Sequence, residues 1–376
     1  MKKLKIPGNA GNKKSGIQRR QFLAGTVVAA TSVALSEQVV AQDSDASLRL
    51  YSWPDYIDDE TLADFSAQSG ISISVDTYDN GDEMLSTIAS ADNQYDVVIA
   101  AYDYIEEMIA KNFLLPIDHR EIPNSNNLFP VFTDATFDPG RRFTMPFLWG
   151  TQGICYRKSA VTKTPDSWSI LFESEAHSGR IAIPGPDTLG LALKYLGFSY
   201  NSVNADELEA AGALIIQQKP HVRSLSYSDG IELLANGDVD VAVGWNSEIL
   251  ELMKDDHDID YRVPNEGSLL WQDCICILRT TPNASKAHLL LNYALNAEVA
   301  ATTAEEFWYA TPNEAALKLL PAAYREDNVI FPGMEIIERC EPALNLGEAG
   351  TRLRDEIWKK VSEASENYRM SKEKQN

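Results

Sequence analysis

Residues Glu266-Gly-Ser-Leu-Leu-Trp-Gln-Asp-Cys-Ile-Cys-Ile-Leu278 contain the strand around which we expect the fold to be built. The run after Gly267 is short, apolar and preceded by a turn residue, which is typical of a strand. Apolar residues on both of its faces indicate burial from both sides, as in α/β sheets. Asp273 interrupts the run. It shares a face with Trp271, because side chains two residues apart on a strand point the same way.

A buried carboxylate such as that of Asp273 needs a partner, because burying an unpaired charge is costly. Two interpretations are open. In the first, a residue of this protein forms an internal salt bridge or capping bond with Asp273, which is the more common situation for a single acid on a strand. In the second, a ligand supplies the missing cation. Recurrence of the same pairing elsewhere in the chain favours the second interpretation.

The pairing of an aromatic with an acidic residue does recur, at or beside several predicted strands. Aromatic faces attract cations and cover methylene groups, and carboxylates bind ammonium groups through charge-assisted hydrogen bonds. A slot lined by both suits a flexible aliphatic amine with a charge at each end. Core packing combined with a helix cap is the alternative for any one pair. The candidates are Trp53 with Asp55 and Tyr56, Asp103 between Tyr102 and Tyr104, Trp245 with Glu248, and Trp271 with Asp273.

The order of predicted elements indicates an α/β fold. Strands are expected over 48–52, 71–78 and 95–100, with amphipathic helices between them, and this βαβαβ order predicts a parallel sheet with helices on both faces. Ligands of such sheets bind beyond the carboxyl ends of the strands, where several of the candidates lie. Residues 112–145 have little periodicity, and a new unit begins near Phe143. About 335 residues after the predicted leader are too many for one core, so two domains are expected.

The first 41 residues have the features of an export signal. A basic start is followed by an apolar, small-residue stretch from Phe22 to Leu35, and Val39-Val40-Ala41 fits a cleavage site. Arg19-Arg20 followed by Gln21-Phe22-Leu23 matches the twin-arginine type of bacterial signal. An ordinary secretory signal with two adjacent arginines is the alternative. We predict a periplasmic protein that begins near Gln42.

Charge and cysteine content exclude several classes of protein. The chain has 33 Lys and Arg against 55 Asp and Glu, and the first 41 residues hold seven of the former and one of the latter, so the remainder carries a net charge of −28. This balance argues against nucleic-acid partners and fits cationic ones. No CxxC pair is present and the five histidines are scattered, so neither a metal nor a cofactor is expected. The sequence leaves the pairing of Cys155, Cys274, Cys276 and Cys340 open.

Six short motifs, in order over residues 48–345, resemble the spermidine/putrescine-binding proteins of bacterial ABC transporters. The resemblance implies a two-lobed periplasmic binding protein of type II, with a mainly parallel sheet flanked by helices in each lobe. One lobe would hold 46–149 and 272–317, and the other 150–271 and 318–376. The motifs are Leu50-Tyr-Ser-Trp-Pro-Asp-Tyr-Ile57, Tyr95-Asp-Val-Val-Ile99, Met145-Pro-Phe-Leu-Trp-Gly150, Leu234-Ala-Asn-Gly-Asp238, Val243-Gly-Trp245 and Thr311-Pro-Asn-Glu-Ala-Ala316.

The resemblance also implies a monomeric receptor that holds putrescine or spermidine between the lobes and delivers it to a membrane permease. Trp271 and Asp273 would then lie at the cleft. Asp187 matches a carboxylate at the start of a second-lobe helix, although an N-cap role is the alternative there. Glu248 has a similar alternative, because an acid is favourable near a helix start. The implied contacts are Trp53, Asp55 and Tyr56 from one lobe, Asp187, Trp245 and Glu248 from the other, and Tyr309.

Three departures from the family pattern leave the identity of the ligand open. Pro54 stands where the family has Ser or Thr, Ala100-Ala101 replaces Pro-Ser, and Pro184 stands where some spermidine binders have an additional acid. A site with fewer acids would prefer the shorter diamine or another amine. Two other functions are the alternatives: the same fold with another small solute such as a sugar, and an exported glycosidase with Glu248 and Asp273 as its paired carboxylates.

Overall fold

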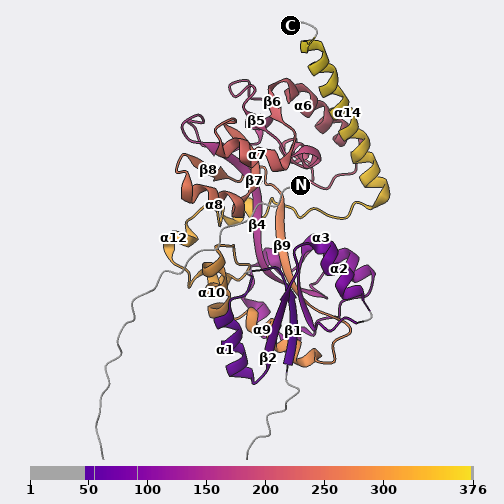
Figure 1. Cartoon of the computed structure of the whole chain (residues 1–376), viewed down its shortest axis with the longest axis vertical. Coiled ribbons are helices and arrows are strands. Elements are labelled where there is room, and N and C mark those ends of the chain that lie inside the picture. Colours follow the sequence, from indigo (N-terminus) through magenta and orange to yellow (C-terminus); the bar gives the residue numbers. More distant parts are fainter. Residues whose placement is uncertain (1–46, 55, 91, 374–376) are drawn as a thin grey trace, which may run out of the picture. The chain divides into compact units, whose positions relative to one another are not determined.

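The strand expected in residues 266–278 is β9 (Leu270–Ile277), and it lies in the middle of a nine-stranded sheet (Figure 1). The computed structural model describes residues 47–54, 56–90 and 92–373. The strand order is β2-β1-β3-β9-β4-β7-β5-β6, and β8 pairs with β4 outside this path. The predicted leader over residues 1–41 lies outside the described residues.

The first half of the sheet has the predicted βαβαβ order, with β1 parallel to both β2 and β3. Local sequence explains the helix ends. The Asp58 side chain accepts a hydrogen bond from the Thr61 amide at 2.8 Å, and Gly70 ends the helix in the left-handed conformation at a φ of 73°. The elements are β1 (Ser47–Ser52), α1 (Asp59–Ser69), β2 (Ser72–Thr77), α2 (Gly81–Ala89), β3 (Val97–Ala101) and α3 (Tyr102–Ala110).

In the second half of the sheet, β5 lies between β6 and β7 and runs parallel to both. Helices α5 and α6 pack on each other, and the C-terminal helix α14 packs on α6 (Figure 1). The elements are α4 (Ser169–Phe172), β5 (Ile181–Ala182), α5 (Thr188–Tyr195), α6 (Ala205–Gln218), β6 (Val222–Ser224), α7 (Tyr227–Ala235), β7 (Val241–Trp245), α8 (Asn246–Asp255), β8 (Ile259–Arg262) and α14 (Gly347–Glu373).

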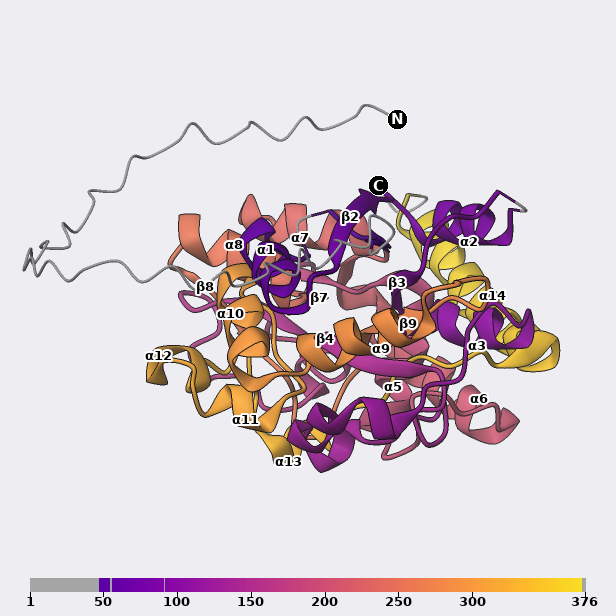
Figure 2. The ribbon, with the colours of Figure 1, turned by 90° about the horizontal axis from the view of Figure 1, so that it is seen from below.

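The two halves are joined by β4 (Thr144–Arg157) and β9, which run antiparallel to each other through the centre of the sheet. Each also pairs antiparallel with its outer neighbours, β9 with β3 and β4 with both β7 and β8. The sheet is therefore parallel in its outer strands and antiparallel at its centre. The remaining α-helices of the described residues are α9 (Ala284–Ala294), which packs against β9 (Figure 2), α10 (Ala297–Phe307), α11 (Glu314–Leu317), α12 (Ala322–Arg325) and α13 (Met334–Ile337).

Residues on one face of β4 pack in two separate hydrophobic cores. Met145 and Leu148 pack in the core of the first half, and Ile154 and Tyr156 pack in the core of the second half. A bulge between Pro146 and Leu148 keeps these residues on one face, because the extra residue offsets the alternation of side chains. Between the two cores, the same face of β4 carries Gly150 and Gln152.

A third connection between the halves is the segment of residues 341–345, which lies between α13 and α14. The Asn201 side chain holds it on one side, donating to the Pro342 carbonyl and accepting from the Leu344 amide, both at 2.9 Å. On the other side the Asn345 amide donates to Glu106 Oε2 at 2.8 Å. Since Glu106 lies on α3, this segment links α3 to the second half.

The four cysteines are free thiols, so the possibility of a disulfide left open by the sequence is not realised here. Among residues 47–373, apart from the two undescribed positions, no helix has both the length and the apolar character needed to cross a membrane. Within the same part of the chain, no group of three or more His, Cys, Asp or Glu side chains is arranged to hold a metal ion.

Candidate functional site

Asp273 is buried in the structure, as the sequence predicts, with 5% of its surface exposed. It lies on β9 opposite Ala101 of β3 and Leu148 of β4. The Tyr56 hydroxyl, from the loop after β1, donates a 2.5 Å hydrogen bond to Asp273 Oδ2. Two residues that are 217 positions apart are thus brought together by the sheet.

The environment of Asp273 opposes its ionisation. Burial raises the pKa of the Asp273 carboxyl to about 7, the hydrogen bond from Tyr56 lowers it, and the negative charge of Asp103 raises it further. Burial, followed by the charge of Asp273, also raises the pKa of the Tyr56 phenol. Among the described residues, no Lys, Arg or His forms an ion pair with Asp273. Within the described part of the chain, the carboxylate therefore has one hydrogen-bond donor and no cation.

Asp103 faces the same site from the first turn of α3, which begins directly after β3. The residue is exposed as a whole, but the surrounding protein removes water from its carboxyl group and this desolvation raises its pKa. The phenol of the preceding residue, Tyr102, has a raised pKa because of burial, the charge of Asp103, and the charges of Asp187 and Asp273. Tyr102 thus lies within the electrostatic reach of three carboxylates from three different elements.

Aromatic side chains that pack on one another lie near Asp273. The rings of Trp271 and Tyr309 are perpendicular at 89°, with their centres 5.6 Å apart, and Tyr309 lies 5.7 Å from Tyr56. Trp53 is half-buried and packs on Tyr78 at 4.3 Å. Tyr78 was not among the predicted site residues. Its only sequence signal is an aromatic at the end of a predicted strand, a feature that equally describes a core residue.

Gly150 gives Trp271 the space to lie across β4. The two residues are paired in the sheet, and a Cβ atom at position 150 would come within 2.5 Å of Trp271 Nε1 and 2.4 Å of Asn246 Oδ1. Any larger residue must therefore displace the indole. The sequence motif that ends at Gly150 resembles the family pattern, but the reason for its glycine is visible only in the paired strands.

We expect Gly150→Ala to weaken ligand binding about tenfold, because overpacking of this size displaces the ring of Trp271, a predicted ligand contact. Calorimetric titration of the purified protein measures the change. Gly230→Ala is the control, since a Cβ atom there would meet only the Ala182 and Ala242 side chains, at 3.4 and 3.9 Å. Equal affinity in the two variants would contradict the role assigned to Gly150.

Trp245 and Glu248 lie at the junction of β7 and α8. Trp245 is half-buried, pairs with Gln152 of β4 and packs on the core of the second half. Glu248 is exposed, and its Oε2 accepts a hydrogen bond from the Trp245 amide at 3.4 Å. This contact supports the helix-start interpretation of Glu248, in which the acid stabilises the first turn of α8.

Asp187 precedes the first residue of α5, but its side chain makes no capping hydrogen bond. The helix-cap interpretation of this residue is therefore wrong. Burial raises the pKa of its carboxyl, and the charge of Arg354 on α14 lowers it. Arg354 was not predicted from the sequence, because it lies in the predicted C-terminal helix, 167 residues away, where a basic residue is typical of an exposed surface. The remaining predicted residue, Asp55, lies outside the described residues.

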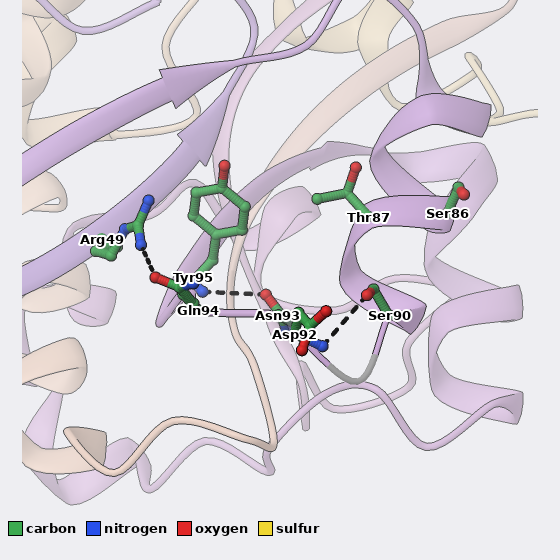
Figure 3. A pocket seen from close by; sticks show the side chains of 8 residues that line it. All are labelled: Arg49, Ser86, Thr87, Ser90, Asp92, Asn93, Gln94 and Tyr95. Carbon is green, nitrogen blue, oxygen red and sulfur yellow. Dashed lines mark hydrogen bonds between the residues drawn. The ribbon is translucent and has the colours of Figure 1, made fainter.

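A hollow of about 390 Å³ lies beside β1, α2 and the loop that precedes β3 (Figure 3). Arg49 at the start of β1 borders it, whereas Trp53 follows the end of that strand. The Arg49 guanidinium is already paired with Asp76 at 3.0 Å and stacks over the Tyr95 ring. The other lining residues are Ser86, Thr87, Ser90, Asp92, Asn93 and Gln94, none of which is a predicted site residue.

The chain is similar to known proteins over most of its length. A family model described as bacterial extracellular solute-binding protein matches residues 60–331. The putrescine/agmatine-binding protein of Pseudomonas aeruginosa is 29% identical over 361 residues, covering 89% of this chain and 97% of that protein. The spermidine/putrescine-binding periplasmic protein of Escherichia coli is 28% identical over 339 residues, with coverages of 89% and 97%.

A solved structure has the same fold. It is the spermidine/putrescine ABC transporter substrate-binding protein PotD from Streptococcus pneumoniae, with a TM-score of 0.80 and 29% sequence identity, covering 85% of this chain and 99% of that one. The predicted α/β fold of the type II periplasmic binding proteins is confirmed by this match.

Proposed function

We propose, from the premise that this chain belongs to the bacterial extracellular solute-binding proteins, that it is a receptor that captures putrescine or spermidine for an ABC transporter. The observation that carries the proposal is Asp273, which is buried on the same strand face as Trp271 and has no cation partner among the described residues. An ammonium group supplies the missing charge and is covered by the neighbouring aromatic rings. The names of the similar proteins support an amine as the ligand.

In this proposal each predicted residue has a defined role. Asp273 and Asp103 bind the first ammonium group, and Asp187 binds a charge at the other end of the ligand. Glu248 adds negative charge near Trp245. The rings that cover the methylene chain are those of Trp53, Tyr56, Trp245, Trp271 and Tyr309, and Asp55 completes the set of predicted contacts.

We also propose that the ligand closes two lobes on each other. One lobe comprises residues 46–149 and 272–317, and the other comprises 150–271 and 318–376. The boundary then crosses the paired strands β4 and β9 at Gly150 and Trp271. Closure would bring the carboxylates of the first lobe to Asp187 and Trp245 of the second. Motions of this kind are common among ligand-binding proteins of two domains.

The same proposal predicts how the protein is exported, where it acts and which partner it has. The protein would be exported through the twin-arginine pathway by residues 1–41, act as a monomer in the periplasm, and deliver its ligand to a permease in the inner membrane. It would bind its ligand without converting it, as a receptor rather than an enzyme.

Calorimetric titration with putrescine and spermidine, each at low and moderate salt, tests the proposal. We expect one-to-one binding that weakens with salt, because the attraction between charges is screened. The control ligand is 1,4-butanediol, which has the length of putrescine but no charge, and should give no heat. Binding of a neutral sugar but of neither amine, with no response to salt, would contradict the proposal in favour of the sugar-binding alternative.

A further inference from the structure

Gln152 lies on β4, on the same sheet face as two of the three tryptophans of the candidate site, Trp245 and Trp271. It pairs with Trp245 of β7, and opposed residues in an antiparallel pair project from the same face. Gly150, two residues earlier on the same face, pairs with Trp271 of β9. Asp273 is two residues from Trp271 on that face. The register of three strands therefore places Asp273, Trp271, Gln152 and Trp245 on one continuous surface.

The Gln152 side chain is unusual because it is completely buried and unpartnered. It has no exposed surface, yet neither Nε2 nor Oε1 has a hydrogen-bond partner among the described residues. Buried amides in proteins are almost always hydrogen-bonded, because an unsatisfied donor or acceptor destabilises the fold. Gln218, another buried glutamine of this chain, donates to the Ser174 carbonyl at 3.0 Å. Gln152 thus differs from a structural glutamine of the same protein.

We propose that the Gln152 carboxamide determines which amine the site prefers, by accepting a hydrogen bond from an N–H group in the middle of the ligand. This inference rests on the proposed function. In the proposed function the terminal ammonium groups bind carboxylates on other elements, Asp273 on β9 and Asp187 before α5. Gln152 lies on β4, one of the two strands that join the halves, and the register places it between Trp271 and Trp245, opposite the interior of an extended ligand that spans the two carboxylates.

A linear triamine has an N–H group at such an interior position, whereas a diamine has only methylene groups there. A diamine would leave the buried carboxamide unsatisfied, and sites built to hydrogen-bond a polar group discriminate strongly against analogues that lack it. The site therefore selects a triamine such as spermidine over a simple diamine. This preference is opposite to the one expected from the loss of acids at Pro184.

The matched ligands for the test are spermidine and 1,8-diaminooctane, which differ only in the replacement of the internal N–H group by a methylene. We expect the wild-type protein to bind spermidine at least about tenfold more tightly, the usual value of a hydrogen bond to a charged group. Gln152→Met keeps the size of the side chain and removes its polar atoms. It should reduce the ratio of the affinities for spermidine and 1,8-diaminooctane about tenfold without lowering the melting temperature.

Gln218→Met is the control variant, because it removes a buried carboxamide that has an internal partner. It should lower the melting temperature and leave the ratio of the two affinities unchanged. Gln152→Glu serves as a second variant in case Gln152→Met does not fold. Its added negative charge should increase the preference for spermidine.

The possible results separate this inference from the proposed function. Amine binding by the wild type without preference for spermidine, or equal weakening of both ligands in Gln152→Met, overturns the role of Gln152 and leaves the polyamine receptor intact. Absence of binding to either amine, and to putrescine, overturns the proposed function and the inference with it.

Discussion

Asp273→Asn is expected to weaken the binding of putrescine by at least about a hundredfold, because removing one partner of a buried, hydrogen-bonded charge pair leaves the other uncompensated. The substitution keeps the shape of the side chain and its contact with Tyr56, so the loss reports the charge. Calorimetric titration at pH 8 measures it. Trp271→Ala should also weaken binding, through loss of the ring that is proposed to cover the ligand.

The same variant is expected to be more stable than the wild type when no ligand is present. Burial raises the pKa of Asp273 to about 7, so at pH 8 the folded protein carries a buried carboxylate that Asn replaces with a neutral group. Asp240→Asn is the control. Asp240 is equally buried but paired with Arg180 at 2.6 Å and His177 at 3.1 Å, so its substitution should lower stability and leave binding unchanged. A stability loss without a binding loss at Asp273 would show a structural role instead.

The second large effect is the pH dependence of binding. In the proposed site an ammonium group binds the ionised form of Asp273, so the association constant should be nearly constant above pH 7.5. For a pKa of about 7, it should fall roughly twentyfold between pH 7.5 and 5.5. Among the described residues, the groups that act on Asp273 or respond to its charge are Tyr56 after β1, Tyr78 after β2, Tyr102 and Asp103 on α3, Cys274 on β9, and Tyr309 after α10. The phenols stay protonated over this range.

Folding stability should depend on pH in the opposite direction to binding. The pKa of Asp273 is higher in the folded than in the unfolded protein, so its contribution is fully present below about pH 4 and is lost as the pH rises towards 7. Asp273→Asn should remove both dependences. An association constant that is unchanged down to pH 5.5 in the wild type would contradict the assignment of Asp273 as the first ammonium partner.

Periodicity and cap residues were sufficient to predict the elements of residues 47–101. The pattern there is local: alternating apolar residues form β1 and β2, and Asp58 and Gly70 bound α1. The importance of Asp273 was also predictable, because a single acidic residue in an apolar strand is unfavourable unless it has a partner. The antiparallel centre of the sheet was not predictable from local pattern, since the direction of β9 depends on which neighbours it pairs with.

Other parts of the site depend on contacts between distant residues. Asp187 has the sequence context of a helix cap, and only the structure shows that it makes no such bond. Gln152 is an ordinary polar residue in sequence, and its significance comes from being buried without a partner. Arg354 acts on Asp187 from α14, and no local pattern connects the two residues. In each case the position follows from packing rather than from propensity.

The state of the four cysteines makes this protein suitable for conversion into a fluorescent sensor. Burial raises the pKa of every thiol, to about 12 for Cys274, to about 11 for Cys340 and well above the ordinary value for Cys155 and Cys276. Maleimide dyes react with the thiolate, so these native cysteines react slowly at neutral pH. A single cysteine introduced on an exposed surface near the site can therefore carry a dye that reports ligand capture, without removal of any native cysteine.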